Sequence, residues 1–300
     1  MKKIHIFVSL LLCVLLTGCG LRESAPQIAA TTLPVYELTS RLCDGTSLSV
    51  GRLVTEEVSC LHDYSLNVNQ VRTAESAEVI VISGAGLEGF LDDLLLNKPI
   101  IDASRNIALI VPEEHHHDHN DESHTEEADH HGHHHETDPH IWLSPANAII
   151  MADTICQELT RLYPAHAGIL ENNLEQLLSE LDALREYGET TLAELSCREI
   201  ITFHDGFSYL AQAFDLTILD AIEEESGSEA SAKELIHMIE EVQHHQLPAV
   251  FTEKSGSVSA AGIIARETGA KEFSLDMAMA GDSYFEAMYR NINTLKEALQ

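Results

Sequence analysis

Basic and aromatic residues are scarce in this 300-residue sequence. Tryptophan occurs once and aromatic residues make up 5% of the chain, which argues against an aromatic-lined sugar-binding groove. Only 17 Lys and Arg stand against 49 Asp and Glu, giving a net charge of −32. Proteins that bind duplex nucleic acid present a basic face, so nucleic acid is excluded as a partner. The apolar share of 44% nevertheless indicates a globular protein rather than an acidic disordered tail.

Long apolar runs are also missing, apart from one at the start of the sequence. Residues 4–16 follow Lys2 and Lys3, and this run of 13 residues is short of the roughly 20 that a membrane-spanning helix needs. A basic start followed by a short apolar run is typical of a signal peptide. We therefore expect the mature chain to be anchored to a membrane rather than threaded through it.

The end of that run carries an anchoring motif. Residues 16–19 read L-T-G-C, which resembles the lipobox of bacterial lipoproteins, where the chain is cut before the cysteine and lipid such as palmitate is attached to it. We predict a signal peptide over residues 1–18, a lipid anchor on Cys19 and a tether over residues 19–26. The protein would then lie on the extracytoplasmic side of the cell membrane, at the cell surface or in the periplasm.

Four further cysteines follow Cys19, namely Cys43, Cys60, Cys156 and Cys197. An even number in an exported chain permits one or two disulfides. Pairing the neighbours in sequence gives Cys43–Cys60 and Cys156–Cys197. Buried free thiols are an equally open alternative.

From residue 27 onward, short β-rich runs alternate with helical patterns. Strands are expected at residues 27–32, 47–54, 78–83, 99–103, 199–203, 217–221, 249–252 and 271–275. This alternation predicts an α/β fold with parallel sheets. Between the two sets of strands, apolar residues recur at helical spacing from Ala165 to Leu195.

The predicted fold is therefore two α/β lobes with parallel sheets joined by one long rigid helix. We place the N-terminal lobe at residues 27–163, the linking helix at 164–197 and the C-terminal lobe at 198–300. A single helix of about 30 residues is roughly 45 Å long and resists hinge opening, so we expect only a small motion on binding.

Residues 113–138 interrupt the first lobe. They hold ten His and ten Asp or Glu but no Lys or Arg, and little in them could fill a core. We expect a solvated, mobile loop that binds several metal ions weakly, although a spacer without a role in binding fits the composition as well. The candidate ligands of this loop are His115, His116, His117, His119, His124, His130, His131, His133, His134 and His135.

Metal-ligating residue types stand at the expected strand ends. His62, His204, Glu253 and Asp276 each follow a predicted strand, and His140 precedes a predicted helix. Open α/β sheets bind ligands beyond the carboxyl ends of their strands, and three imidazoles with one carboxylate form a closed tetrahedral zinc set. Taken singly, each of these residues also fits an ordinary polar residue at a strand end.

Several segments together resemble a known family. They are residues 60–64 (C-L-H-D-Y), 84–88 (G-A-G-L-E), 138–145 (D-P-H-I-W-L-S-P) and 203–209 (F-H-D-G-F-S-Y), with the shorter 251–253 (F-T-E) and 275–276 (L-D). Over residues 27–300 the chain resembles the cluster A-I solute-binding proteins of metal ABC transporters, the zinc-binding lipoproteins similar to ZnuA and AdcA.

The resemblance implies a function and a set of ligands. The protein would be the extracytoplasmic, high-affinity zinc-binding component of an ABC-type importer. It would act as a monomer that delivers Zn²⁺ to a membrane permease driven by an ATPase subunit. The implied ligands are His62, His140, His204 and Asp276, and Glu253 is a possible outer group or alternative ligand.

Two departures from the family pattern affect this assignment. The family usually has one proline beside the first histidine and another shortly after the tyrosine that follows it, whereas this chain has S-C-L (59–61) before His62 and S-L (65–66) after Tyr64. The first ligand loop is therefore less rigid, and Cys60 is a remote alternative thiolate ligand. The proline that many relatives have after the last ligand is also missing. Asp276 is therefore the least certain ligand, with Asp282 a remote alternative.

The predicted metal follows from the type of ligand. Members of the family that resemble manganese binders carry a carboxylate at the third position, where this chain has His204. Nitrogen-rich sites favour zinc over manganese, so Zn²⁺ is the predicted ion. The alternatives are a manganese-binding protein of the same family and a surface zinc buffer or adhesin.

Two other function classes have weaker support. Residues 84–89 match the dinucleotide pattern G-x-G-x-x-G, but we interpret them as a strand-to-helix turn, since dinucleotides are scarce outside the cell. An exported zinc hydrolase is the other rival. The sequence has neither an H-E-x-x-H helix nor a G-x-S-x-G elbow, so we predict that the protein is not an enzyme.

Overall fold

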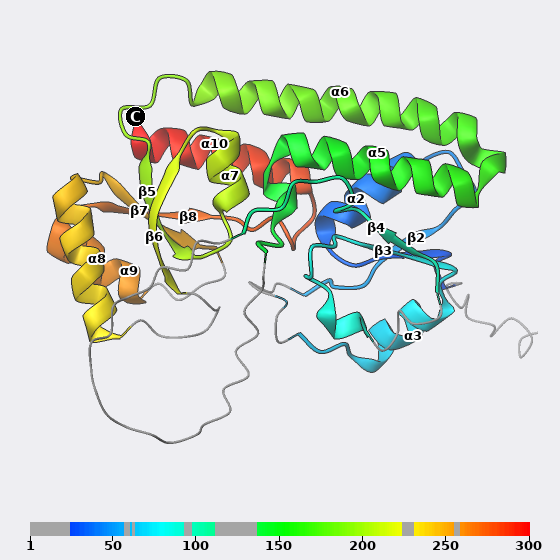
Figure 1. The fold of residues 1–300 in the computed structure, drawn as a ribbon, viewed down its shortest axis with the longest axis horizontal. Coiled ribbons are helices and arrows are strands. Elements are labelled where there is room, and N and C mark those ends of the chain that lie inside the picture. The colour runs from blue at the N-terminus through cyan, green and yellow to red at the C-terminus, as the bar shows by residue number, and fades with distance from the viewer. Residues whose placement is uncertain are drawn as a thin grey trace, which may run out of the picture.

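The chain forms two α/β lobes that lie side by side (Figure 1). The computed structural model describes residues 25–56, 61, 64–92, 98–111, 137–223, 231–254 and 259–300. The first lobe contains a parallel sheet in the order β2-β1-β3-β4, and the second a parallel sheet in the order β6-β5-β7-β8. The predicted fold class, with two parallel sheets and one long helix between them, is confirmed.

The strands of the first sheet are β1 (Ile28–Ala30), β2 (Val50–Arg52), β3 (Val79–Ile82) and β4 (Ile100–Asp102). The central strand β1 pairs with both neighbours, so that Ile28 lies opposite Val50 on one side and Val79 on the other. β3 reads Val-Ile-Val-Ile and is nearly all buried. Branched apolar side chains suit a strand covered on both faces, which explains why this sheet could be recognised from sequence.

The strands of the second sheet are β5 (Glu199–His204), β6 (Thr217–Glu223), β7 (Ala249–Glu253) and β8 (Lys271–Leu275). Phe251 of β7 lies opposite Thr202 of β5 and Phe273 of β8. Two predicted boundaries shift by one residue: His204 and Glu253 are the last residues of their strands rather than the first residues beyond them.

Helices cover these sheets. They are α2 (Leu33–Leu42), α3 (Val68–Ser76), α5 (Pro145–Leu162), α6 (Ala167–Thr191), α7 (Ser208–Ala213), α8 (Ala232–His245), α9 (Ser259–Thr268) and α10 (Tyr284–Leu299), with 3₁₀ turns η1 (Gly89–Leu91), η2 (Ile141–Leu143) and η3 (Pro164–His166). The first turns carry local signals that fix where helices begin. Ser144 and Ser283 cap α5 and α10 by accepting backbone hydrogen bonds, and Asn67 forms a capping box with Gln70.

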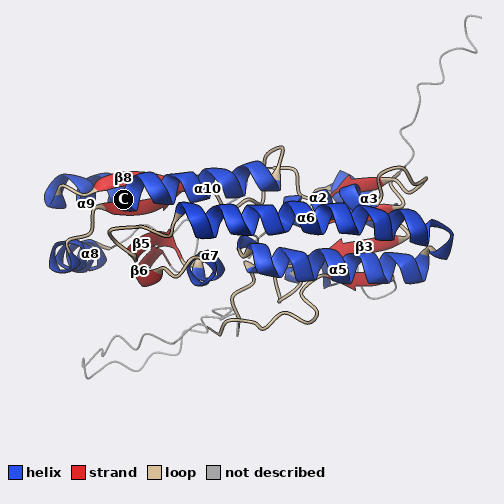
Figure 2. Cartoon of the chain, turned by 90° about the horizontal axis from the view of Figure 1, so that it is seen from above, coloured by secondary structure: helices blue, strands red, loops and turns tan. Residues whose placement is uncertain are grey.

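The long helix α6 lies over both lobes, as Figures 1 and 2 show from two directions. Its 25 residues give a length of about 37 Å at 1.5 Å per residue. One side of it is buried through Leu170, Leu177, Leu181 and Leu184, and it packs on α5 and α2 of the first lobe and on α10 of the second. Because α6 packs against both lobes, it holds them in place instead of acting as a flexible linker.

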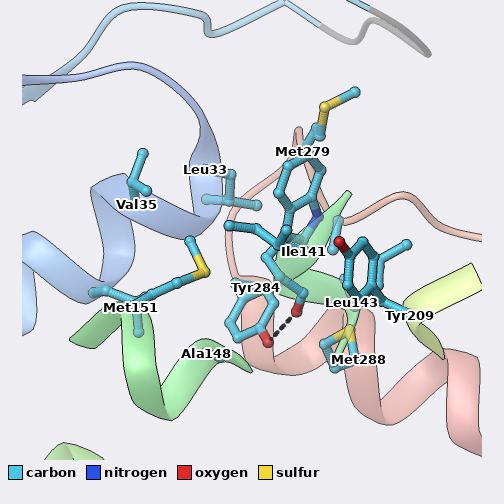
Figure 3. Packing of buried hydrophobic residues seen from close by; sticks show 14 of the residues in the cluster. Leu33, Val35, Ile141, Leu143, Ala148, Met151, Tyr209, Met279, Tyr284 and Met288 are labelled. Atoms are coloured by element: carbon cyan, nitrogen blue, oxygen red, sulfur yellow. Dashed lines mark hydrogen bonds between the residues drawn. The ribbon is translucent and has the colours of Figure 1, made fainter. Parts of the chain in front are cut away.

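Within the described part of the chain, the largest of three buried hydrophobic clusters runs through both lobes, and a smaller one lies in each lobe. The same buried cluster contains Ile28 and Val81 of the first sheet and Phe251 and Leu275 of the second. Figure 3 shows its centre, where Leu33 of α2, Ile141 of η2, Met279 of the loop after β8 and Tyr284 of α10 come together. The lobes are thus joined by apolar packing, in addition to the covalent link through α6.

The described cysteines form no disulfides. Cys43, Cys156 and Cys197 are free thiols. The predicted pairs Cys43–Cys60 and Cys156–Cys197 are therefore both wrong. Cys60 itself lies outside the described residues. Cys43 and Cys156 are buried in the shared core, where they act as small apolar side chains, and burial raises the pKa of Cys43 to about 12.

The membrane anchor predicted at Cys19 falls in residues 1–24, outside the described residues. Among the helices that the structure does describe, none combines the length and the apolar character needed to cross a membrane.

We predict opposite stability effects for two glycine-to-alanine substitutions. In Gly188→Ala, the new Cβ of α6 would lie 2.2 Å from Cε1 of Phe214, a buried residue of the second lobe, so overpacking should lower the unfolding free energy by about 1–3 kcal/mol. In Gly262→Ala of α9, nothing lies within 4 Å, and the higher helix propensity should raise stability by about 0.5–1 kcal/mol. Urea unfolding of both variants checks this, and equal effects would contradict the close contact at Gly188.

Candidate metal centre

His140 lies at the junction of the two lobes, directly before η2 and α5. The local sequence fixes this position: Asn147 donates from its amide nitrogen to the carbonyl oxygen of Ile141 at 3.1 Å, and Ser144 caps the helix that follows. His140 itself is only 1% exposed. The sequence motif D-P-H-I-W-L-S-P therefore folds as a tight turn that buries an imidazole.

Asp138 orients the His140 ring. Its Oδ1 accepts the backbone N–H of His140 at 2.9 Å and lies 2.9 Å from Nδ1 of the same residue. Burial alone would raise the pKa of Asp138, but the hydrogen bonds and charge of His140 hold that pKa below its usual value. Because an ionised carboxylate can only accept, Nδ1 is the donor to Asp138, and Nε2 is the ring nitrogen that remains to bind a metal ion.

His140 Nε2 is a buried atom. This atom has no hydrogen-bond partner among the residues that the structure describes. A buried polar atom without a partner is costly, and a histidine whose other nitrogen is held by a carboxylate is the usual arrangement of a metal ligand. The geometry at His140 thus fits a metal ion.

His204 brings a second imidazole to the same place. It is the last residue of β5, is 3% exposed, and its ring centroid lies 5.4 Å from that of His140 at an interplanar angle of 85°. Gly206 makes this approach possible, since a Cβ there would lie 2.8 Å from Cδ2 of His204 and 3.0 Å from Cε1 of His140. The structure therefore joins two of the predicted ligands, one from each lobe.

Asp276 follows β8 and is held at both its backbone and its side chain. Asn291 of α10 accepts the N–H of Asp276 at 2.8 Å and donates to its carbonyl oxygen at 2.7 Å. The carboxylate accepts the N–H of Ala278 at Oδ1, at 2.9 Å, and its Oδ2 lies 3.3 Å from Lys254 Nζ and 3.2 Å from an Arg290 guanidinium nitrogen. The acidic group is thus engaged by two cations.

The other predicted site residues stand as follows. His62, the alternative ligand Cys60 and all ten histidines of the 113–138 loop lie outside the described residues. Glu253 is buried at the end of β7, and Asp282 is exposed in the loop before α10. Within the described ranges, no group of three or more His, Cys, Asp or Glu is close enough to hold a metal ion.

Several functional neighbours were not found from sequence. Asn291 could have been noticed, because it is a polar residue on the buried face of α10 beside Met288, Ile292 and Leu295. The spacing Asp138-x-His140 was another available signal for a carboxylate that orients a ligand. Gly206 lies in the recognised segment 203–209, but its role in the approach of the two imidazoles was not predicted. Nothing local marks Lys254 or Arg290, whose contacts with Asp276 arise only from the tertiary fold.

The glycine-rich segment after β3 is a turn organised by a buried carboxylate. Glu88 accepts hydrogen bonds from Thr31 Oγ1 at 2.7 Å, from the Ser83 N–H at 2.7 Å and from the Gly84 N–H at 3.0 Å. Gly84 has φ +86°, and a Cβ there would lie 1.9 Å from Asp102 Oδ1. The amides that would bind a pyrophosphate are already bound to an acidic group, which supports the rejection of a dinucleotide site.

Comparison with known proteins shows the family. The family described as "Zinc-uptake complex component A periplasmic" (ZnuA) matches residues 28–298. The chain belongs to this family, whose members are metal-binding solute-binding proteins of ABC transporters and not enzymes. The predicted family and the prediction that the protein is not an enzyme are thereby confirmed.

Individual relatives carry the names of different metals. A metal-binding protein from Treponema pallidum (strain Nichols) is 29% identical, over 95% of this chain and 91% of its own length. The zinc-binding lipoprotein AdcA of Streptococcus pneumoniae serotype 4 is 28% identical, over 99% of this chain and 61% of its own. The manganese-binding lipoprotein MntA of Bacillus subtilis (strain 168) is 26% identical, over 95% of both chains.

A solved structure shows the same architecture. The crystal structure of ZnuA aligns with a TM-score of 0.76 and 28% identity, covering 92% of this chain and 100% of that one. The arrangement of the two lobes is therefore that of a metal-transport solute-binding protein.

Gly206→Ala should weaken metal binding without unfolding the chain. The added methyl group must displace His204, His140 or the Met277 methyl group, which would lie 2.7 Å away, so the two imidazoles should no longer meet in the same geometry. Competition with a chromophoric chelator measures the loss, expected to be about tenfold or more by analogy with other changes around metal ligands. Gly89→Ala, where nothing lies within 4 Å, is the matched control. Equal affinities for the two variants would contradict the proposed role of Gly206.

Glu88 should impose a pH dependence on stability. Burial raises its pKa from 4.5 to about 7, against the opposing effect of its three hydrogen bonds. Between these two values the folded chain keeps a proton that the unfolded chain releases, so the unfolding free energy should fall as pH rises from about 4.5 to 7.

Urea unfolding at pH 5 and pH 7.5, with a metal chelator present, tests this effect. Glu88→Gln cannot titrate and should lose less stability across that range than the unaltered chain, whereas the exposed Glu171→Gln should behave like the unaltered chain. Parallel pH profiles for all three proteins would show that Glu88 does not titrate in this window.

Proposed function

We propose that this protein is the extracytoplasmic zinc-binding component of an ABC-type importer and delivers Zn²⁺ to a membrane permease. The observation that carries the proposal is the buried His140, whose Nδ1 is held by Asp138 and whose Nε2 has no partner in the described residues. Family membership supports the transport role.

Zinc is favoured over manganese by the available donors. His140 and His204 provide two imidazoles whose ring centroids lie 5.4 Å apart. Imidazole nitrogen suits zinc, whereas manganese is better served by carboxylate and other oxygen ligands. Manganese is the second candidate because a relative of similar identity, MntA, is named for that metal.

The full proposed ligand set is His62, His140, His204 and Asp276. His62 and Asp276 enter through the family resemblance, and Glu253, buried at the end of β7, is an alternative or outer group. Three nitrogens and one oxygen would form the closed tetrahedral shell of a site that holds an ion rather than activating water. Such a shell suits a carrier.

Anchoring and partners complete the proposal. Cys19 would carry the lipid, consistent with the word lipoprotein in the names of the relatives AdcA and MntA. A lipid anchor keeps a carrier close to its permease while leaving it free to rotate. The protein would act as a monomer, with the permease and its ATPase as partners.

The loop at residues 113–138 is proposed as an auxiliary zinc collector. Its ten histidines and ten carboxylates concentrate cations electrostatically, and its last residue stands two positions before His140. Metal captured there would be released beside the tight site. The loop is not proposed to supply a ligand to that site.

Metal analysis of the purified full-length chain tests the proposal. We expect one tightly bound zinc per chain that excess manganese does not displace. His140→Ala should lower zinc affinity by more than about a hundredfold, and Asp138→Asn by about ten- to a hundredfold because the ligand loses its orientation. The exposed His244→Ala should have no effect. Preferential retention of manganese would favour the second candidate, and unchanged zinc affinity in His140→Ala would refute the site.

A further inference from the structure

Two cations lie against the one acidic group of the proposed ligand set. Lys254, the residue after β7, and Arg290 of α10 both contact Oδ2 of Asp276, at 3.3 Å and 3.2 Å. We infer that Lys254 and Arg290 are specificity-determining residues, which weaken the Asp276 carboxylate as a metal ligand and thereby favour zinc over manganese. This inference rests on the proposed function.

Hydrogen bonds to neighbouring residues fix the position of the Asp276 carboxylate. Asn291 is 1% exposed and fixes the Asp276 backbone through two hydrogen bonds, and the Ala278 N–H fixes Oδ1. The Asp276 side chain is 13% exposed, whereas those of Lys254 and Arg290 are 50% and 55% exposed. A mostly buried anion is therefore clamped by two cations at its solvent side.

Counting acceptor sites shows how little of the carboxylate is left for a metal. A carboxylate has about four lone-pair positions. Ala278, Lys254 and Arg290 occupy three of them. A metal ion could take the remaining position or must displace one of the cations.

Charge acts in the same direction. Asp276, Lys254, Arg290 and Glu286, whose carboxylate lies 3.9 Å from Arg290, have a net charge of zero, so this group does not attract a divalent cation as a free carboxylate would. Water moderates the effect, since both cations are half-exposed. Removal of either cation should therefore strengthen the carboxylate as a ligand by a measurable but modest factor.

The two metals should respond differently. Zinc is bound well by imidazole and depends less on the carboxylate, whereas manganese needs oxygen ligands. A clamped carboxylate therefore costs manganese more affinity than it costs zinc. In this way two residues that do not ligate the metal would shift the preference of a histidine-rich site further toward zinc.

The test uses Lys254→Gln and Arg290→Gln in the full-length chain, with zinc and manganese affinities measured separately by chelator competition. We expect manganese affinity to rise about two- to fivefold for each substitution, the range of an exposed ion pair, and zinc affinity to rise less. Lys271→Gln is the matched control, because it removes one exposed positive charge at the other end of β8, the strand that leads to Asp276. Thermal melting of each variant verifies that it is folded.

A second set of variants separates the specific effect from a general change in charge. In an Asp276→Asn background, Lys254→Gln should no longer alter manganese affinity. Unchanged manganese affinity in both single variants, an equal gain in Lys271→Gln, or a gain that persists without Asp276 would each overturn the inference while leaving the proposed function intact. Failure of the unaltered chain to bind either metal would refute both.

Discussion

The geometry of the site depends on the attachment of one tryptophan to the second lobe. Trp142 follows His140 by two residues, and its Nε1 donates to the carbonyl oxygen of Met277 at 2.8 Å. Its own carbonyl oxygen accepts the Tyr284 hydroxyl at 2.7 Å. Since Met277 directly follows Asp276, these two buried bonds connect the turn that carries one proposed ligand to the loop that carries another.

Further contacts across the junction strengthen this attachment. The Tyr284 N–H donates to Glu37 of α2 at 2.6 Å, and the Arg41 guanidinium lies over the Phe285 ring at 4.5 Å from its centroid. A large hinge motion between the lobes would have to break these contacts and the shared hydrophobic core, which would cost free energy. Rearrangement on metal binding is therefore expected in side chains and short loops, where the Asp276 carboxylate has alternative partners within reach.

The sequence predicts regular elements well where local signals are strong. The strand at Lys271–Leu275 has the bounds that the sequence predicts. The turn that carries His140 and the strand that carries His204 could also be placed, because their motif is specific and their flanking residues are apolar. The contact between the two imidazoles is consistent with the family resemblance.

The surroundings of Asp276 could not be predicted, because they depend on long-range contacts. Lys254 and Arg290 are 22 and 14 residues away in sequence, and only the packing of β7, β8 and α10 brings them together. The disulfide pairing failed for the same reason, since it was inferred from distance along the chain alone. Local patterns specify elements, whereas the partners of a side chain at an element's end are set by the tertiary fold.

The buried thiols have a consequence for how the chain reaches its native state. Cys43 and Cys156 lie in the core as free thiols, and the thiolate form of Cys43, which disulfide exchange requires, is suppressed by its pKa of about 12. Folding of the described residues thus needs neither an oxidant nor an isomerase to sort cysteine pairs. The core can form in the same way under aerobic and anaerobic conditions, and oxidants reach these two sulfurs only when the chain opens.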